Sequence, residues 1–89
     1  MNTETSRVYQ WMCDDPQSVL DVDFFVGVYS DDAGLWCDIE ELAMMLCSYT
    51  STLHRLGIRG GVQPNFTKTQ LASVDWEELA NQVAEDRDT

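Results

Sequence analysis

The residues of this sequence that could do chemistry are above all its carboxylates, which occur in close doublets. Twelve of the sixteen Asp and Glu residues lie in the doublets Asp14-Asp15, Asp21-x-Asp23, Asp31-Asp32, Glu40-Glu41, Glu77-Glu78 and Glu85-Asp86. Two carboxyls can act as general acid and base when an apolar pocket raises the pKa of one of them. Asp14-Asp15 and Asp31-Asp32 instead stand among turn-forming residues, where water reaches the side chains. The doublets therefore predict a charged surface, and we expect the protein not to be an enzyme.

Nucleophilic and metal-ligating residues are few and far apart. The chain has one histidine, His54, and three cysteines, Cys13, Cys37 and Cys47, with no Cys-x-x-Cys pair. A structural zinc site needs ligands at short spacing, and a calcium loop needs a glycine and a distant Glu that the acidic segments lack. We therefore predict no metal and no cofactor, and we expect the cysteines to be reduced and mostly buried.

The composition predicts one small folded domain, residues 1–89, with a strong negative charge. The formal net charge is −11, and 44% of the residues are apolar. That apolar share is typical of a globular domain rather than of a disordered acidic tail. The sequence shows neither the apolar run of a membrane helix nor the basic start and apolar stretch of a signal peptide. We expect a cytoplasmic protein that does not contact a membrane.

A β-hairpin is predicted in the first half of the chain. Residues 20–29 are rich in β-branched and aromatic side chains, which favour a strand. Turn formers occupy residues 30–34, and residues 35–37 form a short apolar return segment. The sequence therefore predicts two short antiparallel strands here.

The other predicted elements are short helices with apolar stripes and capping residues. They cover residues 6–12, 38–47 and 50–56 and a last stripe from Trp76 to Ala84 that follows a cap at Asp75. Thr67 with Gln70 forms a further capping box. Pro16 ends the first of these helices, because the residue before a proline avoids helical angles. The predicted fold class is therefore α+β, with a small β-hairpin or sheet packed against three to four short α-helices.

Residues 39–56 resemble a helix-turn-helix unit. Ala43, Cys47 and Leu53 occupy the places of its small residue, its turn and its later apolar residue. In that family the second helix enters the major groove of DNA. The nucleic-acid contacts that this alternative implies are Thr50, Ser51, His54 and Arg55, with Arg59 as a further cation of the same acid-free segment. A DNA-binding transcriptional regulator of phage or plasmid type is therefore the alternative function.

The chain as a whole resembles, in type, the small acidic phage-encoded inhibitors of bacterial defence, namely anti-CRISPR and anti-restriction proteins. The resemblance is carried by small size, strong acidity and carboxylate doublets, which offer a field like that of DNA phosphates. It implies a protein partner that normally binds nucleic acid and whose nucleic-acid site is occupied. A merely soluble acidic surface, or adaptation to salt, is the simpler interpretation of the same charge.

Candidate partner-binding residues come from the doublets and from methionines that exceed what one apolar stripe per helix can bury. They are Asp14, Asp15, Asp31, Asp32, Glu40, Glu77, Glu78, Met44 and Met45. Methionine is enriched at protein interfaces, and a second copy of the chain, giving a homodimer, is another occupant that such residues allow.

We expect the purified protein to leave duplex DNA unshifted in a gel at physiological salt and micromolar protein. Affinity for DNA depends on Lys and Arg that neutralise phosphates, and this chain has only five of them against sixteen acids. A sequence-selective shift that Arg55→Ala abolishes would instead establish the regulator.

Overall fold

The fold is entirely helical in the part of the chain that the structure describes. The computed structural model describes residues 1–31, 37–56 and 66–87, with side chains up to residue 53 in the second range and up to residue 86 in the third. The helices are α1 (Thr3–Asp14), α2 (Pro16–Val28), α3 (Ile39–Leu56), α4 (Lys68–Ala72) and α5 (Trp76–Arg87). The predicted α+β fold class is therefore wrong, since these ranges contain no sheet.

The segment predicted as the first strand of a hairpin is the helix α2. Only one isolated antiparallel bridge, between Ser30 and Cys37, remains of the predicted pairing, and residues 32–36 lie outside the described residues. Local signals at the start of α2 outweigh the strand preference of its Val and Phe residues. Asp15 accepts a hydrogen bond from the backbone N–H of Ser18, and Pro16 occupies the first helical position, where its missing N–H costs nothing.

Capping residues determine where the described helices begin. Each is preceded by a residue whose side-chain oxygen accepts a backbone N–H of the first turn: Asn2, Asp15, Asp38, Thr67 and Asp75. The caps predicted at Asp38, Thr67 and Asp75 are confirmed. Thr67 also forms the complete capping box with Gln70, whose side chain accepts the N–H of Thr67 at 2.9 Å.

The two helices predicted within residues 38–56 are a single helix. α3 runs without interruption for 18 residues, so the turn expected at Cys47 is absent. No glycine or proline occurs between residues 39 and 56, so nothing in this segment breaks the backbone hydrogen-bond ladder. The segment therefore lacks the two-helix geometry of a helix-turn-helix unit.

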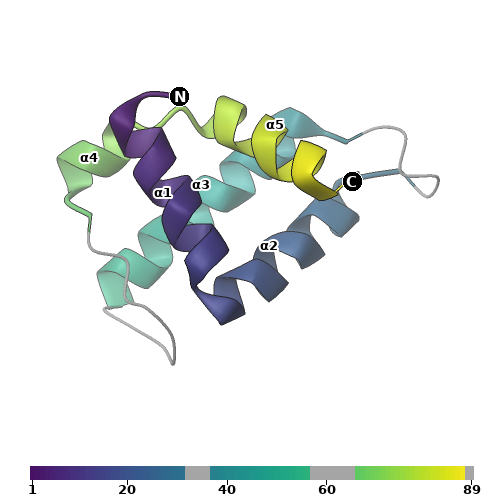
Figure 1. The fold of residues 1–89 in the computed structure, drawn as a ribbon, viewed down its shortest axis with the longest axis horizontal. Coiled ribbons are helices and arrows are strands. Elements are labelled where there is room, and N and C mark those ends of the chain that lie inside the picture. The colour runs from purple at the N-terminus through teal and green to yellow at the C-terminus, as the bar shows by residue number, and fades with distance from the viewer. Residues whose placement is uncertain (32–36, 57–65, 88–89) are drawn as a thin grey trace.

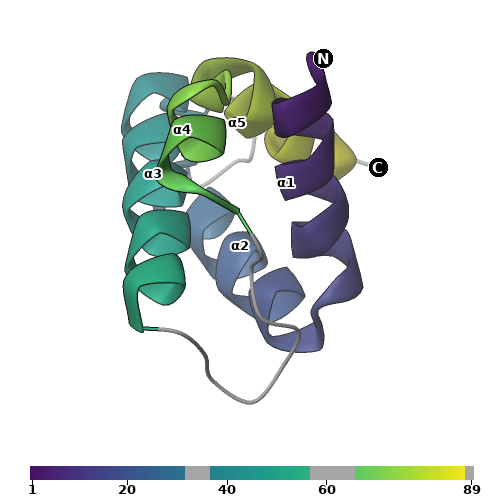
Figure 2. The ribbon, with the colours of Figure 1, turned by 90° about the vertical axis from the view of Figure 1, so that its left-hand side faces the viewer.

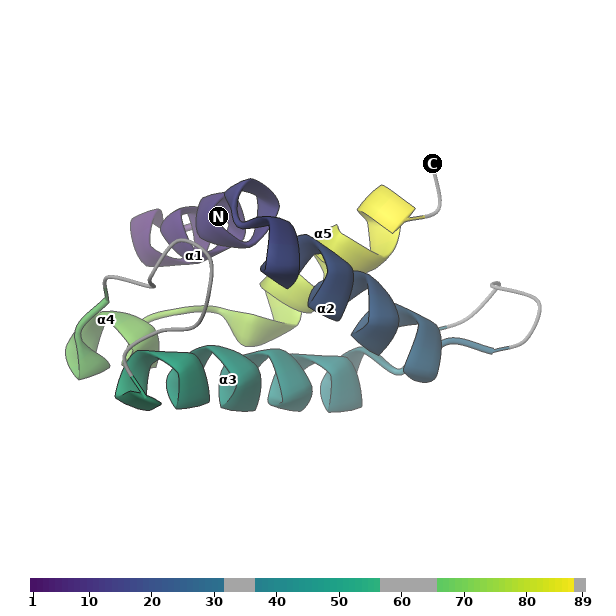
Figure 3. The same cartoon turned by 90° about the horizontal axis from the view of Figure 1, so that it is seen from below.

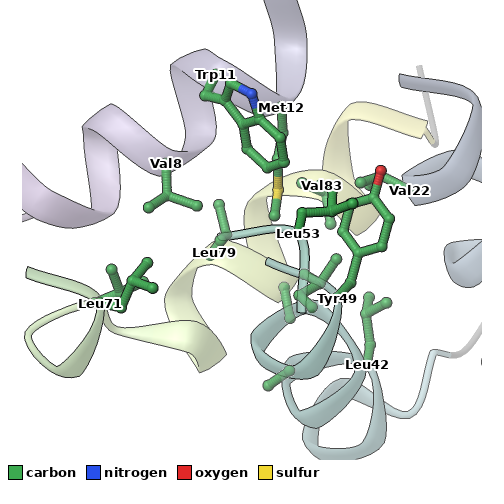
Figure 4. Close-up of a cluster of buried hydrophobic side chains, with 14 of the residues drawn as sticks. Val8, Trp11, Met12, Val22, Leu42, Tyr49, Leu53, Leu71, Leu79 and Val83 are labelled. Carbon is green, nitrogen blue, oxygen red and sulfur yellow. The ribbon is translucent and has the colours of Figure 1, made fainter. Parts of the chain in front are cut away.

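The helices enclose one apolar core in a molecule of 36 × 26 × 19 Å. α3 passes behind α1 and α5 in Figure 1. Figure 2 shows α3 and α1 on opposite sides, with α4 and α5 above and α2 below. In Figure 4, Val8 and Met12 of α1 point toward Leu79 and Val83 of α5, with Tyr49 of α3 beside them. The three predicted apolar stripes on α1, α3 and α5 all face this core, which confirms them.

Leu46→Ala should lower the free energy of unfolding by about 2–5 kcal/mol, because Leu46 is completely buried in the core. Met44, two residues away on α3, is 64% exposed and provides the matched control. Met44→Ala should change stability by less than about 0.5 kcal/mol. Urea unfolding followed by circular dichroism measures both, and equal losses would contradict the burial of Leu46.

Candidate interaction surface

The doublet Asp14-Asp15 is divided between the surface and the interior. Asp14 is exposed and accepts hydrogen bonds from Gln10 Nε2 at 3.0 and 3.1 Å. Asp15 is only 3% exposed, and one of its oxygens accepts from both the backbone N–H and the hydroxyl of Ser18, at 3.1 and 2.7 Å. The second member of this doublet is therefore a helix cap, and it cannot contact a partner in this fold.

The candidates near the start of α3 are mostly exposed. Asp31 and Glu40 lie on the surface, whereas Asp32 lies outside the described residues. Met44 is 64% exposed, but Met45 is half-buried and packs against the core. Of the two methionines, only Met44 presents an apolar side chain to a partner.

The doublet Glu77-Glu78 is exposed in the first turn of α5. Glu78 Oε1 lies 3.3 Å from the N-terminal amine of Met1, and the backbone N–H of Asp75 donates to the hydroxyl of Thr5 at 2.8 Å. These contacts hold the start of α5 against the start of α1. Carboxylates in a first turn are favoured by the positive end of the helix dipole.

The structure does not gather the acidic candidates into one patch. α3 begins beside the end of α2, where the N–H of Asp38 donates to the carbonyl oxygen of Tyr29 at 2.7 Å. α5 begins instead beside the chain's N-terminus, as Figures 1 and 3 show. The exposed carboxylates are thus distributed over separate parts of the surface.

Of the residues of the alternative nucleic-acid interface, only Thr50 and Ser51 have side chains that the structure describes, and neither is exposed. Thr50 is completely buried, and its hydroxyl has no hydrogen-bond partner among the described residues. Ser51 is half-buried. The side chains of His54 and Arg55, and all of Arg59, lie outside the described residues.

The outer face of α2 is a second surface feature, which the sequence analysis missed. Leu20, Phe24 and Val28 are 66, 67 and 55% exposed, and we call these three residues the α2 strip. Their spacing of four places them along one side of the helix. The sequence signal for this strip is an apolar segment without a continuous polar face. Such a segment fits the predicted strand and a helix with an unpartnered side equally well.

Two hollows adjoin the α2 strip. One, of about 370 Å³, lies along the strip beside Gly27 and Asp23. The other, of about 290 Å³, extends from Leu20 and Asp23 between α2, α1 and α5 and reaches Tyr9, Met12, Val83 and Asp86. Both hollows have mainly apolar walls, and Asp23 lines both of them.

Tyr9 and Asp86 close one end of the hollow of about 290 Å³. The Tyr9 hydroxyl donates a hydrogen bond to Asp86 Oδ2, while Gln82 Nε2 donates to Asp86 Oδ1 at 2.9 Å. The hydrogen bond to Asp86, together with burial and the nearby Cys13 thiol, raises the pKa of Tyr9 well above its usual range. The Tyr9 hydroxyl therefore acts as a hydrogen-bond donor at this end of the hollow.

The described side chains do not form a metal site. No three His, Cys, Asp or Glu residues among them converge on a point where they could hold an ion. Cys13 is exposed, and Cys37 and Cys47 are half-buried, so the prediction of mostly buried thiols is wrong. None of the described helices is both long enough and apolar enough to cross a bilayer.

Comparison of the chain with models of protein families found no match, and comparisons with curated proteins and with solved structures found none either.

Asp15→Ala should destabilise the protein by about 1–3 kcal/mol, because it removes the cap of α2 and leaves the Ser18 hydroxyl without its acceptor. Asp14→Ala is the matched control and should be neutral within about 0.5 kcal/mol. Thermal and urea unfolding measure both variants. Equal stability of the two would mean that Asp15 is not the structural member of the doublet.

Proposed function

We propose that this protein is a non-enzymatic acidic binding protein. It inhibits a protein that normally binds nucleic acid, in the manner of anti-CRISPR or anti-restriction inhibitors, by occupying that protein's nucleic-acid site. The observation that carries this proposal is the disposition of charge. Asp15 is the only buried carboxylate among the described residues, so the others meet solvent fully or in part.

Few cations among the described residues offset this charge. Their two cationic side chains are Arg7 and Lys68. The Arg7 guanidinium lies 5.4 Å from the centre of the Phe66 ring, and neither cation forms an ion pair with a described carboxylate. The surface therefore keeps a strong negative potential, which draws a positively charged nucleic-acid site toward it.

Distribution of the acids suits this task better than a single patch would. A nucleic-acid site is a groove or channel with cations along its length, because the duplex it holds carries one negative charge per ~1.7 Å of its axis. An acidic domain 36 Å long with carboxylates near the starts of both α3 and α5 presents charge to several parts of such a site. Steering by this charge raises the association rate and weakens as salt screens it.

The helix-turn-helix regulator has less support. α3 has no turn, and Thr50, one of its implied DNA contacts, is completely buried. A net charge of −11 also opposes the approach to DNA.

The partner should be a nucleic-acid-binding protein that no longer binds its nucleic acid when this chain is present. A pull-down from the native host identifies it, and a gel shift of its nucleic acid with and without the chain measures inhibition. A captured partner that binds no nucleic acid, or whose gel shift persists at saturating inhibitor, would contradict the proposal.

Reversing the charge of Glu40 and Glu77 to Lys should lower the association rate with that partner severalfold and weaken its dependence on salt. Both side chains are exposed, and neither carboxylate has a partner among the described residues. The control variants Glu40→Gln and Glu77→Gln remove charge without reversing it and should give an intermediate effect. Surface-based kinetics measures the rates, and circular dichroism verifies folding. Unchanged association rates in the Lys variants would assign the acidity to solubility alone.

A further inference from the structure

The α2 strip has the geometry of a surface on which another helix packs. The strip occupies positions i, i+4 and i+8 of the helix with Leu20, Phe24 and Val28. Positions i+3 and i+7 beside it are Asp23 and Gly27. These are the positions that bound the holes into which side chains of a packed helix insert. Gly27 has no side chain, so it leaves the hollow of about 370 Å³ open beside Phe24.

No described helix of this chain covers the strip. α2 passes in front of α5 when the molecule is seen from below in Figure 3. Its buried side is occupied by Ser18, Val22 and Val26, and the strip points away from them. Three large side chains each more than half exposed along one helix form an apolar patch of the kind that marks an interaction site.

The negative charge around the strip favours a basic partner over a second copy of this chain as its occupant. Asp21 and Asp23 come from the two flanks of α2 beside the strip, and the whole chain carries a net charge of −11. A second copy would bring the same carboxylates and the same net charge against them, which costs free energy. A partner with Lys and Arg beside its apolar side chains is instead attracted.

We propose that the α2 strip is the docking surface for a basic amphipathic helix of the partner protein. Apolar side chains of that helix, three and four residues apart, pack on Leu20, Phe24 and Val28, and one of them enters the hollow beside Gly27. Its Lys and Arg residues face the carboxylates on either side. This inference rests on the proposed function for the identity of the partner, since basic helices are characteristic of nucleic-acid-binding proteins. The acids then act on association, and the strip acts on dissociation.

A synthetic helical peptide with leucines on one face and lysines on the other is the probe for this surface. Titration followed by fluorescence anisotropy should show binding that weakens as salt is raised. The same peptide with glutamate in place of lysine, and a scrambled Leu–Lys peptide without a continuous apolar face, should both bind at least about tenfold more weakly.

The variant Leu20→Ser/Phe24→Ser should weaken binding of the Leu–Lys peptide at least about tenfold, because it removes two of the three apolar side chains of the strip. Both side chains are mostly exposed, so circular dichroism should show an unchanged helix content. Val19→Ser, on the same helix, removes a side chain that is 46% exposed and lies outside the strip, and it should leave the affinity unchanged.

Three results would overturn the inference. The wild-type protein could fail to bind the Leu–Lys peptide at millimolar concentration, or the strip variant could bind it as tightly as wild type. Sedimentation could also show a wild-type dimer that the strip variant dissociates, which would assign the strip to a second copy of the chain.

Failure of this inference is distinguishable from failure of the proposed function. If the strip variant still inhibits the captured partner while the Glu40→Lys and Glu77→Lys variants do not, the function stands and the docking surface is wrong. If the strip binds basic helices but the captured partner binds no nucleic acid, the docking surface stands and the function is wrong.

Discussion

A short polar network between α2 and α3 determines which side of α2 faces the core. The Ser18 hydroxyl donates to Asp15 at 2.7 Å, the Tyr49 hydroxyl donates to Asp21 at 2.7 Å, and the two hydroxyl oxygens lie 3.1 Å apart. Each hydroxyl has one proton, and both protons go to carboxylates. Because α2 is apolar nearly all round, burial of apolar area alone favours no single orientation, whereas buried polar groups must find partners. The network therefore directs the α2 strip to solvent.

The aromatic side chains around Tyr49 extend this constraint into the core. Phe25 meets the Tyr49 ring edge-on at 5.3 Å between centroids, and Trp11 of α1 lies 6.3 Å away. α1, α2 and α3 thus meet at one side chain that is apolar at its ring and polar at its tip. The ring contacts of Tyr49 hold the three helices together, and the hydrogen bonds of its hydroxyl determine which side of α2 faces the core. The surface that results combines distributed carboxylates, which act over distance, with a compact apolar strip, which acts on contact.

The candidate site could be predicted only in part from the sequence. Carboxylates such as Glu40 and Glu77 could be assigned to the surface because a charged side chain is rarely buried without a partner. Asp15 could not be assigned to the interior from the sequence, since its role as a helix cap depends on whether Pro16 begins a helix. The α2 strip was missed for the same reason: period-two and helical patterns both fit a run of apolar residues, and only the packing of Val22 and Val26 decides between them.

Taken by itself, the sequence determined the helix starts at Asp38, Thr67 and Asp75, the apolar stripes of α1, α3 and α5, and the strong negative charge. These are properties of residues within a few positions of one another, so local hydrogen bonding and periodicity reveal them. Tertiary structure alone decided which side of α2 is buried, that the α2 strip faces solvent, and that Thr50 of α3 is enclosed. Those outcomes depend on contacts between residues distant in the chain, such as Ser18 with Tyr49, whose combined free energy exceeds the small differences in local preference.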